Sequence, residues 1–228
     1  MIGKFHNDCF LFKGLSADEA QKIMERLISR DFRSKEHILR EGNENSNLFL
    51  IESGVVRVDS YNNNNKRQTL SFLKEGDFFG EMAVFTDEKI SANVVSVVNS
   101  KIYTLKKEDL YELMKALPQL SQNIIFYLAN RVKSADKLIY DYAFKMLESR
   151  VASKLIGLMN MFRGKDQETS FINLPITHQD LADYVGTSRE TVTKILAKFK
   201  EKGLIEVQTK RITILDEERL ENWVGDVA

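Results

Sequence analysis

Residues 177–205, THQDLADYVGTSRETVTKILAKFKEKGLI, constrain the fold more than any other stretch of the chain. Thr177 and Asp180 have the spacing of a capping box, so a helix is expected to begin there, and Gly186 is a typical helix end. A second helix is expected to begin after the N-cap residue Ser188. The expected apolar faces of the two helices are Leu181, Ala182 and Val185, and then Val192, Ile195, Leu196 and Phe199. Two helices that cross at so short a turn predict a helix-turn-helix.

The residues after this pair of helices add a second feature. Gly203 ends the second helix, and the sequence LIEVQTKRITIL that follows can form a hairpin, or wing. Helix-turn-helix spacing also occurs in ordinary core units, so the exposed residues decide the interpretation. Residues 188–211 carry seven Lys or Arg against three Glu, on a chain whose net charge is zero. This local basic strip favours binding to nucleic acid.

Candidate DNA contacts lie at the start of the second helix and in the wing. Arg189 can make a bidentate contact to guanine, Glu190 can accept from cytosine N4, and Lys194 can reach a guanine or a phosphate. Side chains better suited to positioning on phosphates are Lys198, Lys200, Lys202, Lys210 and Arg211. The full candidate set for DNA binding is Thr187, Ser188, Arg189, Glu190, Thr193, Lys194, Lys210 and Arg211.

The sequence pattern in the first half of the chain is typical of short β-strands. Between residues 37 and 105, β-branched and aromatic runs are separated by turn residues: HILREG, LFLIESGVVRVDSY, RQTLSFL, DFFGEMAVF and SANVVSVVNSKIYTL. Such spacing predicts an antiparallel sandwich or barrel, with Asn62 to Asn65 as a hairpin tip. Before the strands, Ser16 and Glu19 form a capping-box pattern that predicts a short amphipathic helix within residues 16–29.

A heptad pattern follows the strands. Apolar residues recur at steps of three and four, as in the seam of a two-stranded coiled coil: Ile125, Leu128, Val132, Ala135, Ile139 and Tyr142. Three heptads also fit a helix that faces the core of its own domain. The flanking charges Arg131, Lys133, Asp136 and Lys137 favour a dimerisation helix, over about residues 119–143. We therefore expect a β-rich domain with its dimer helix in residues 1–143, a hinge near 142–146, and a second domain in residues 144–228.

The composition is that of a soluble protein of two domains. The chain has 228 residues, of which 43% are hydrophobic and 29% charged. Its one cysteine, Cys9, cannot form a disulfide within the chain, which fits a reducing cytoplasm. No run approaches the ~20 apolar residues of a membrane span, and the start MIGKFHNDCF is too polar for a signal peptide. We expect a cytoplasmic protein, and residues 162–170, FRGKDQETS, are its most loop-like stretch after the dimer helix.

The strings GDFFGEMAVF and GTSRETVTKIL, with the β-rich half and the seam helix, resemble the Crp/Fnr family of bacterial transcription regulators over nearly the whole chain. The resemblance implies an α+β protein with an N-terminal β-roll (a cyclic-nucleotide-binding-like jelly roll), a long dimerisation helix and a C-terminal winged helix-turn-helix. It also implies a homodimer on a two-fold symmetric operator, a ligand in the β-roll, and RNA polymerase as a partner. Lys194 stands where cyclic-AMP receptors usually have arginine, so the rigid fork is lost there.

The loop of residues 76–95, GDFFGEMAVFTDEKISANVV, departs from the family's cyclic-nucleotide binders. In those proteins the glycine and glutamate matched by Gly80 and Glu81 contact the ribose, and an arginine before a serine holds the phosphate. Here Ile90 precedes Ser91, and an isoleucine cannot neutralise a phosphate. Lys89 is a possible substitute, but it supplies a point charge and no fork.

A second departure lies on the dimer helix, where cyclic-AMP receptors present adjacent Thr and Ser to the adenine. The matching residues are Ala135, which has no hydroxyl, and Asp136, which brings an acid toward an anion. The candidate effector pocket is Gly80, Glu81, Met82, Lys89, Ile90, Ser91, Arg131, Ala135 and Asp136. These departures disfavour cyclic AMP. Another small molecule, a cyclic nucleotide held by Lys89, or regulation without an effector remain open.

Other cofactors find little support in the sequence. A single cysteine excludes an iron–sulfur cluster held by cysteines of one chain, and the histidines outside the DNA-binding half, His6 and His37, fit ordinary surface or strand-edge positions better than haem ligation. An enzyme of the cupin type would need a His cluster that the strands lack. A regulatory module for protein partners would not need the winged helix-turn-helix. We assign no catalytic residue and no metal ligand.

Overall fold

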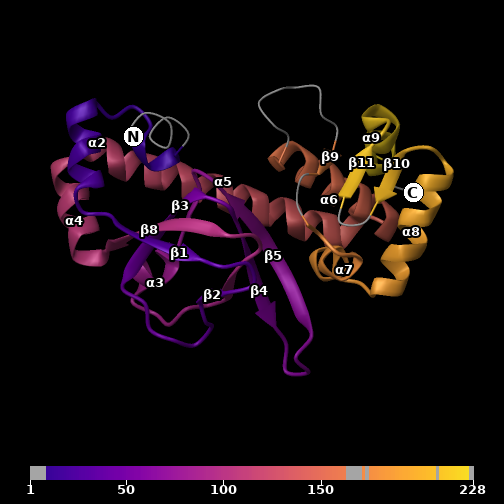
Figure 1. The fold of residues 1–228 in the computed structure, drawn as a ribbon, viewed down its shortest axis with the longest axis horizontal. Helices are drawn as coiled ribbons and strands as arrows, with labels where there is room; N and C mark the ends of the chain where they lie inside the picture. The colour runs from indigo at the N-terminus through magenta and orange to yellow at the C-terminus, as the bar shows by residue number, and fades with distance from the viewer. Residues whose placement is uncertain (1–8, 163–170, 173–174, 209–210, 226–228) are drawn as a thin grey trace. The chain divides into compact units, whose positions relative to one another are not determined.

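The computed structural model describes residues 9–162, 171–172, 175–208 and 211–225. The chain divides into two compact units, one within residues 1–66 and 70–133 and the other within residues 67–69 and 134–228. Helix α5, Pro118–Phe144, is continuous and passes from the first unit into the second (Figure 1). The predicted dimerisation helix, about 119–143, is therefore a single helix.

Two four-stranded sheets build the first unit, with strand orders β1-β8-β3-β6 and β2-β7-β4-β5. Neighbouring strands such as β3 and β8, or β4 and β7, run antiparallel. The strands are β1 Ile28–Phe32, β2 His37–Leu39, β3 Asn47–Ser53, β4 Val55–Tyr61, β5 Arg67–Lys74, β6 Phe78–Phe79, β7 Asn93–Ser96 and β8 Ser100–Lys106. Between the sheets lies a core that includes Ile51, Val56 and Ile102. The predicted β-roll is confirmed.

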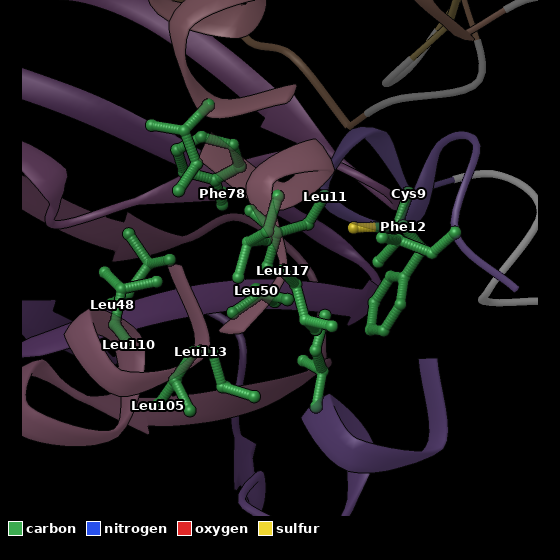
Figure 2. Packing of buried hydrophobic residues seen from close by; sticks show 14 of the residues in the cluster. Cys9, Leu11, Phe12, Leu48, Leu50, Phe78, Leu105, Leu110, Leu113 and Leu117 are labelled. Carbon is green, nitrogen blue, oxygen red and sulfur yellow. The ribbon is translucent and has the colours of Figure 1, made fainter. Parts of the chain in front are cut away.

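Helices cover one end of this roll. They are the 3-10 helix η1 Phe10–Phe12, α2 Ala17–Met24, α3 Glu81–Thr86 and α4 Lys107–Ala116. A second core packs Leu48, Leu50 and Phe78 from the strands against Leu110 and Leu113 of α4, and the start of α5 joins it (Figure 2). This core fixes the start of α5 on the roll, because Leu120 and Ile124 are buried in it.

Several local predictions for this unit are confirmed. Ser16 caps α2, and both hydrogen bonds of the capping box with Glu19 are present. The Asn62–Asn65 segment joins β4 to β5, and Asn65 has a left-handed backbone with φ +55°. The strand pattern ends at Lys106, where α4 follows directly.

Two features of the first unit were not predicted in full. The helix expected within residues 16–29 is confirmed as Ala17–Met24, but the strand β1 that begins at Ile28 was missed. Side chains of β1 are mostly exposed, so no apolar alternation revealed it, and its place is set by backbone pairing with β8. The run DFFGEMAVF is also only partly a strand. Gly80 turns the chain after β6, and Glu81 begins the helix α3.

The second unit contains four further helices and a small sheet among its described residues. Its elements are α6 Leu147–Phe162, β9 Phe171–Ile172, α7 His178–Val185, α8 Arg189–Glu201, β10 Ile205–Gln208, β11 Arg211–Ile214 and α9 Glu217–Gly225. The sheet order is β10-β11-β9. The expected wing is the antiparallel pair β10–β11, and β9 extends it by a strand that the sequence pattern did not predict.

Some predictions fall on residues that are not described. The loop predicted at 162–170 lies outside the described residues apart from Phe162, which ends α6, and so do the wing residue Lys210 and His6. Within the described part of the chain, each helix is either too short or too polar to cross a membrane.

Candidate DNA-binding surface and effector cavity

Short-range hydrogen bonds define the helix-turn-helix. The Thr177 hydroxyl accepts from the backbone N–H of Asp180 at 3.1 Å, and the Asp180 carboxylate accepts from the backbone N–H of Thr177 at the same distance. Helix α7 ends at Gly186, whose φ of +80° lies in the left-handed region. Ser188 then caps α8 by accepting from the backbone N–H of Thr191 at 3.2 Å. The predicted helix boundaries are confirmed.

The two faces of α8 separate as predicted. Its buried residues are Val192, Ile195, Leu196 and Phe199. On the opposite face, near the N-terminal end, the exposed residues are Arg189, Glu190, Thr193 and Lys194. A surface of this kind can enter a major groove with its base-reading side chains at the helix start.

Hydrogen bonds connect α7 and the turn to the exposed surface of α8. Nδ1 of His178 lies 2.9 Å from the Thr193 hydroxyl, which itself donates to the backbone oxygen of Arg189 at 2.9 Å. His178 thus connects α7 to α8, a contact that the sequence pattern did not indicate. The Thr187 backbone N–H donates to Ala182 at 3.0 Å, which ties the turn to α7.

Some charged side chains of residues 188–211 already interact with other groups of the protein. The pKa of Glu190 is lowered, first because its carboxylate accepts from its own backbone N–H and then because it accepts from Ser188, so it stays ionised. Lys198 forms an ion pair with Glu148 at 2.8 Å and also lies over the Trp223 ring. Lys202 lies over the same ring, 5.7 Å from its centroid. Lys194, Lys200 and Arg211 are exposed.

A small cavity lies in the β-roll where the loop after β6 meets α5. Its volume is about 50 Å³, and its lining is mainly apolar: Leu39, Val58, Phe79, Gly80, Glu81, Met82, Ala83, Ile90, Ser91, Ala92, Val94 and Arg131. Six of the predicted pocket residues therefore come together here. The wall residues Leu39, Val58 and Val94 were missed, since only the strand register shows which residues face the cavity.

The other predicted pocket residues lie elsewhere. Lys89 is exposed and lines a separate groove with Asp87 and Lys107, which form an ion pair. Ala135 and Asp136 are exposed on α5 in the second unit. The described lining of the cavity thus holds one cation, Arg131, and Ile90 contributes apolar wall.

Arg131 is already paired within the cavity. Its guanidinium donates to the carboxylate of Glu81, whose side chain is 4% exposed against 34% for Arg131. Glu81 is the first residue of α3, where the helix dipole favours a negative charge. A buried carboxylate needs such partners, because leaving it unpaired in a low-dielectric site is costly.

The size of the cavity also limits what it holds. A volume of about 50 Å³ is room for a few waters, whereas ligand pockets usually span about 300–1,000 Å³. This cavity, which opens to solvent, therefore does not by itself enclose a molecule as large as a cyclic nucleotide.

Cys9 and His37 are the described residues that were considered for iron–sulfur and haem chemistry. Cys9 is buried, and burial raises the pKa of its thiol to about 12, so the reactive thiolate is absent at neutral pH. His37 is half-buried in β2, and burial first of all lowers its pKa. Among the described residues there is no group of three His, Cys, Asp or Glu side chains placed to hold a metal ion.

Comparison with known proteins matches both units. Residues 29–116 match the cyclic nucleotide-binding domain, and residues 149–223 match the Crp-like helix-turn-helix domain. The chain belongs to the Crp/Fnr family. Members of this family are transcription regulators that bind DNA through the helix-turn-helix, and the chain has both of the domains that define them.

Individual Crp/Fnr relatives are distant but align over most of their length. The cyclic AMP receptor protein of Thermus thermophilus is 29% identical over 91% of this chain and 95% of its own. A CRP-like cAMP-activated global transcriptional regulator of Mycobacterium tuberculosis is 25% identical, over 92% and 94%. Electron transport regulator A of Shewanella oneidensis is 26% identical, over 95% and 86%.

Solved structures confirm the fold. The structure of FixK2 from Bradyrhizobium japonicum superposes with a TM-score of 0.79 at 20% identity, covering 89% of this chain and 99% of FixK2. A Crp/Fnr-family regulator from Thermus thermophilus gives 0.72 at 26% identity, covering 88% and 100%. At such low sequence identities, the roles of the site residues have to be inferred from the chemistry of their own side chains.

We predict that Gly80→Ala destabilises the β-roll by about 2–3 kcal/mol in urea unfolding. Gly80 has φ +86°, and a Cβ there would lie 2.9 Å from the backbone oxygen of Asn47 and 3.0 Å from the Phe49 ring. Gly42 is the matched control, because its φ is +83° and no atom lies within 4 Å of an added Cβ. Gly42→Ala should cost only the backbone strain, about 1 kcal/mol. Equal losses for the two variants would contradict the role assigned to Gly80.

Proposed function

We propose that this protein is a homodimeric, sequence-specific transcription regulator that binds a two-fold symmetric operator. The observation that carries the proposal is the exposed set Arg189, Glu190 and Lys194 at the start of a helix whose opposite face is buried. Family membership supports the same reading, since one of the relatives is named as a global transcriptional regulator. Half-sites should lie about one helical turn apart. RNA polymerase is a proposed partner, and the cytoplasm is the proposed location.

The proposed dimer contact is the exposed side of α5. Ile125, Val132 and Ile139 recur every seven residues and are 67%, 61% and 67% exposed, which is unusual for large apolar side chains of a monomer. Leu128 contributes less, because it packs partly against the core of its own unit. Ala135 and Tyr142 are exposed beside this row. A second copy of the same helix is the occupant that a heptad spacing fits.

The proposed effector, if one is bound, is a small molecule other than cyclic AMP. Two relatives are named as cyclic AMP receptors or cAMP-activated regulators. In this chain, however, Ile90 is part of the apolar wall and Arg131 is paired with Glu81. Phosphate binding through Lys89 is disfavoured because Lys89 lines a different groove. We do not propose haem as the effector, and regulation without an effector is the alternative.

The first test of the function concerns base reading. We expect Arg189→Ala to weaken binding to the operator by about 1–3 kcal/mol in a gel-shift or anisotropy titration, because one bidentate contact to a base is lost. The loss should vanish on operators altered at the matching base pair of each half-site. Lys200→Ala is the control, since an exposed lysine on phosphate should weaken specific and random DNA alike. An equal loss for Arg189→Ala on random DNA would refute base reading.

The second test concerns the dimer. Ile139→Asp should give a monomer by multi-angle light scattering, because it places a carboxylate in each copy's apolar contact row. Lys133→Asp is the control: it changes charge on the same helix at an exposed position outside the row. A dimer that survives Ile139→Asp, or one that is lost equally with Lys133→Asp, would contradict the proposed contact.

The third test concerns the effector. Titration calorimetry with cyclic AMP at physiological concentrations should show no heat of binding, because Ile90 offers no charge to the phosphate and the cavity is small. The same preparation should bind operator DNA, which shows that it is active. An isotherm with micromolar affinity would overturn the proposal.

A further inference from the structure

Arg131 lines the cavity, but part of its side chain is exposed on the surface of α5. Although its guanidinium is paired with Glu81, the side chain remains 34% exposed. If Ile125, Val132 and Ile139 are the a positions of the heptad, Arg131 is a g position and Asp136 the following e position. Within one helix, residues five apart point about 140° away from each other, so these two side chains do not meet in the same chain.

Across a parallel pair of helices the geometry is different. A g residue of one helix lies beside the e residue five positions later on the other helix. In α5 the g and e pairs are Ile124 with Ala129, Arg131 with Asp136, and Leu138 with Ala143. The middle pair alone is charged, and its charges are opposite. The parallel arrangement also leaves both C-terminal units on the same side, as a two-fold operator requires.

We propose that, in the dimer, Asp136 of the partner subunit pairs with Arg131, so that one guanidinium binds two carboxylates. One carboxylate is Glu81 in the cavity of the same chain, and the other comes from the second copy. Arginine has five N–H donors in a planar fork and can serve both. The two-fold axis makes the contact occur twice. This inference rests on the homodimer of the proposed function and adds a residue of the second copy to the effector site.

The second carboxylate determines which ligands the site accepts. Within one chain, the charges of Glu81 and Arg131 in the cavity lining cancel. The partner's Asp136 gives each site a net negative charge. An anion such as a cyclic nucleotide would then have to take Arg131 from two carboxylates, whereas an uncharged or cationic small molecule would not. Any ligand that moves Arg131 must also change dimer affinity, because binding linkage is reciprocal.

A double-mutant cycle tests the contact. Dimer dissociation constants are measured by sedimentation for the wild type, Asp136→Asn, Arg131→Gln and the double variant, at low and at high salt. Asp136→Asn should weaken the wild-type dimer about fivefold, as expected for two symmetric exposed ion pairs, and high salt should remove the difference. In the Arg131→Gln background the same change should have less than about a twofold effect. Lys137→Gln, one residue away on the exposed side of α5, is the charge control and should change little.

A second variant keeps the test independent of the buried ion pair. Asp136→Arg alters an exposed position and leaves Glu81 with Arg131, yet it sets two arginines against each other in the dimer. It should weaken the dimer more than Asp136→Asn does, and salt should restore it. Equal effects of Asp136→Asn in both backgrounds, or an unchanged dimer with Asp136→Arg, would overturn the inference alone. A monomeric wild type would overturn the homodimer as well.

Discussion

The ion pair between Glu81 and Arg131 is the interaction on which the charge of the β-roll cavity depends. It connects the start of α3 to the middle of α5, the helix that carries the exposed apolar row. A carboxylate as buried as Glu81 requires a cation, and removing one partner of such a pair typically costs about 3–5 kcal/mol. The position of α3 in turn depends on Gly80, because its backbone conformation and the close approach of β3 exclude a side chain there.

The DNA-binding half was predictable because its signals are local. Capping boxes, a helix-ending glycine and an apolar periodicity all act within a few residues, and Thr177, Gly186 and Ser188 place the two helices as the sequence indicated. The sequence predicted that the first unit is a β-roll, but it did not predict all of the elements of the roll. Strand β1 lacks apolar alternation, and α3 is helical against the β-preference of its neighbours because a left-handed glycine turns the chain before it.

The effector site was only partly predictable for a related reason. Gly80, Glu81 and Ile90 could be named from a linear pattern, but the pairing of Glu81 with Arg131 joins residues fifty positions apart. Sequence spacing likewise cannot show that Leu128 of the heptad packs partly against its own domain. Tertiary packing decides both, and the same packing connects His178 to α8.

The cavity shows why a shared fold does not transfer a ligand from one family member to another. In a site with an arginine at the position of Ile90, a phosphate has its own cation and Glu81 is free to contact a sugar. With Ile90 there, Arg131 is the one cation in the described lining, and the buried Glu81 needs it. Isoleucine in place of arginine at position 90 therefore changes the role of Glu81, because Glu81 is then paired with Arg131. Such a site keeps the backbone of a nucleotide-binding loop but has a different set of charges, so its ligand has to be inferred from these side chains and not from the fold.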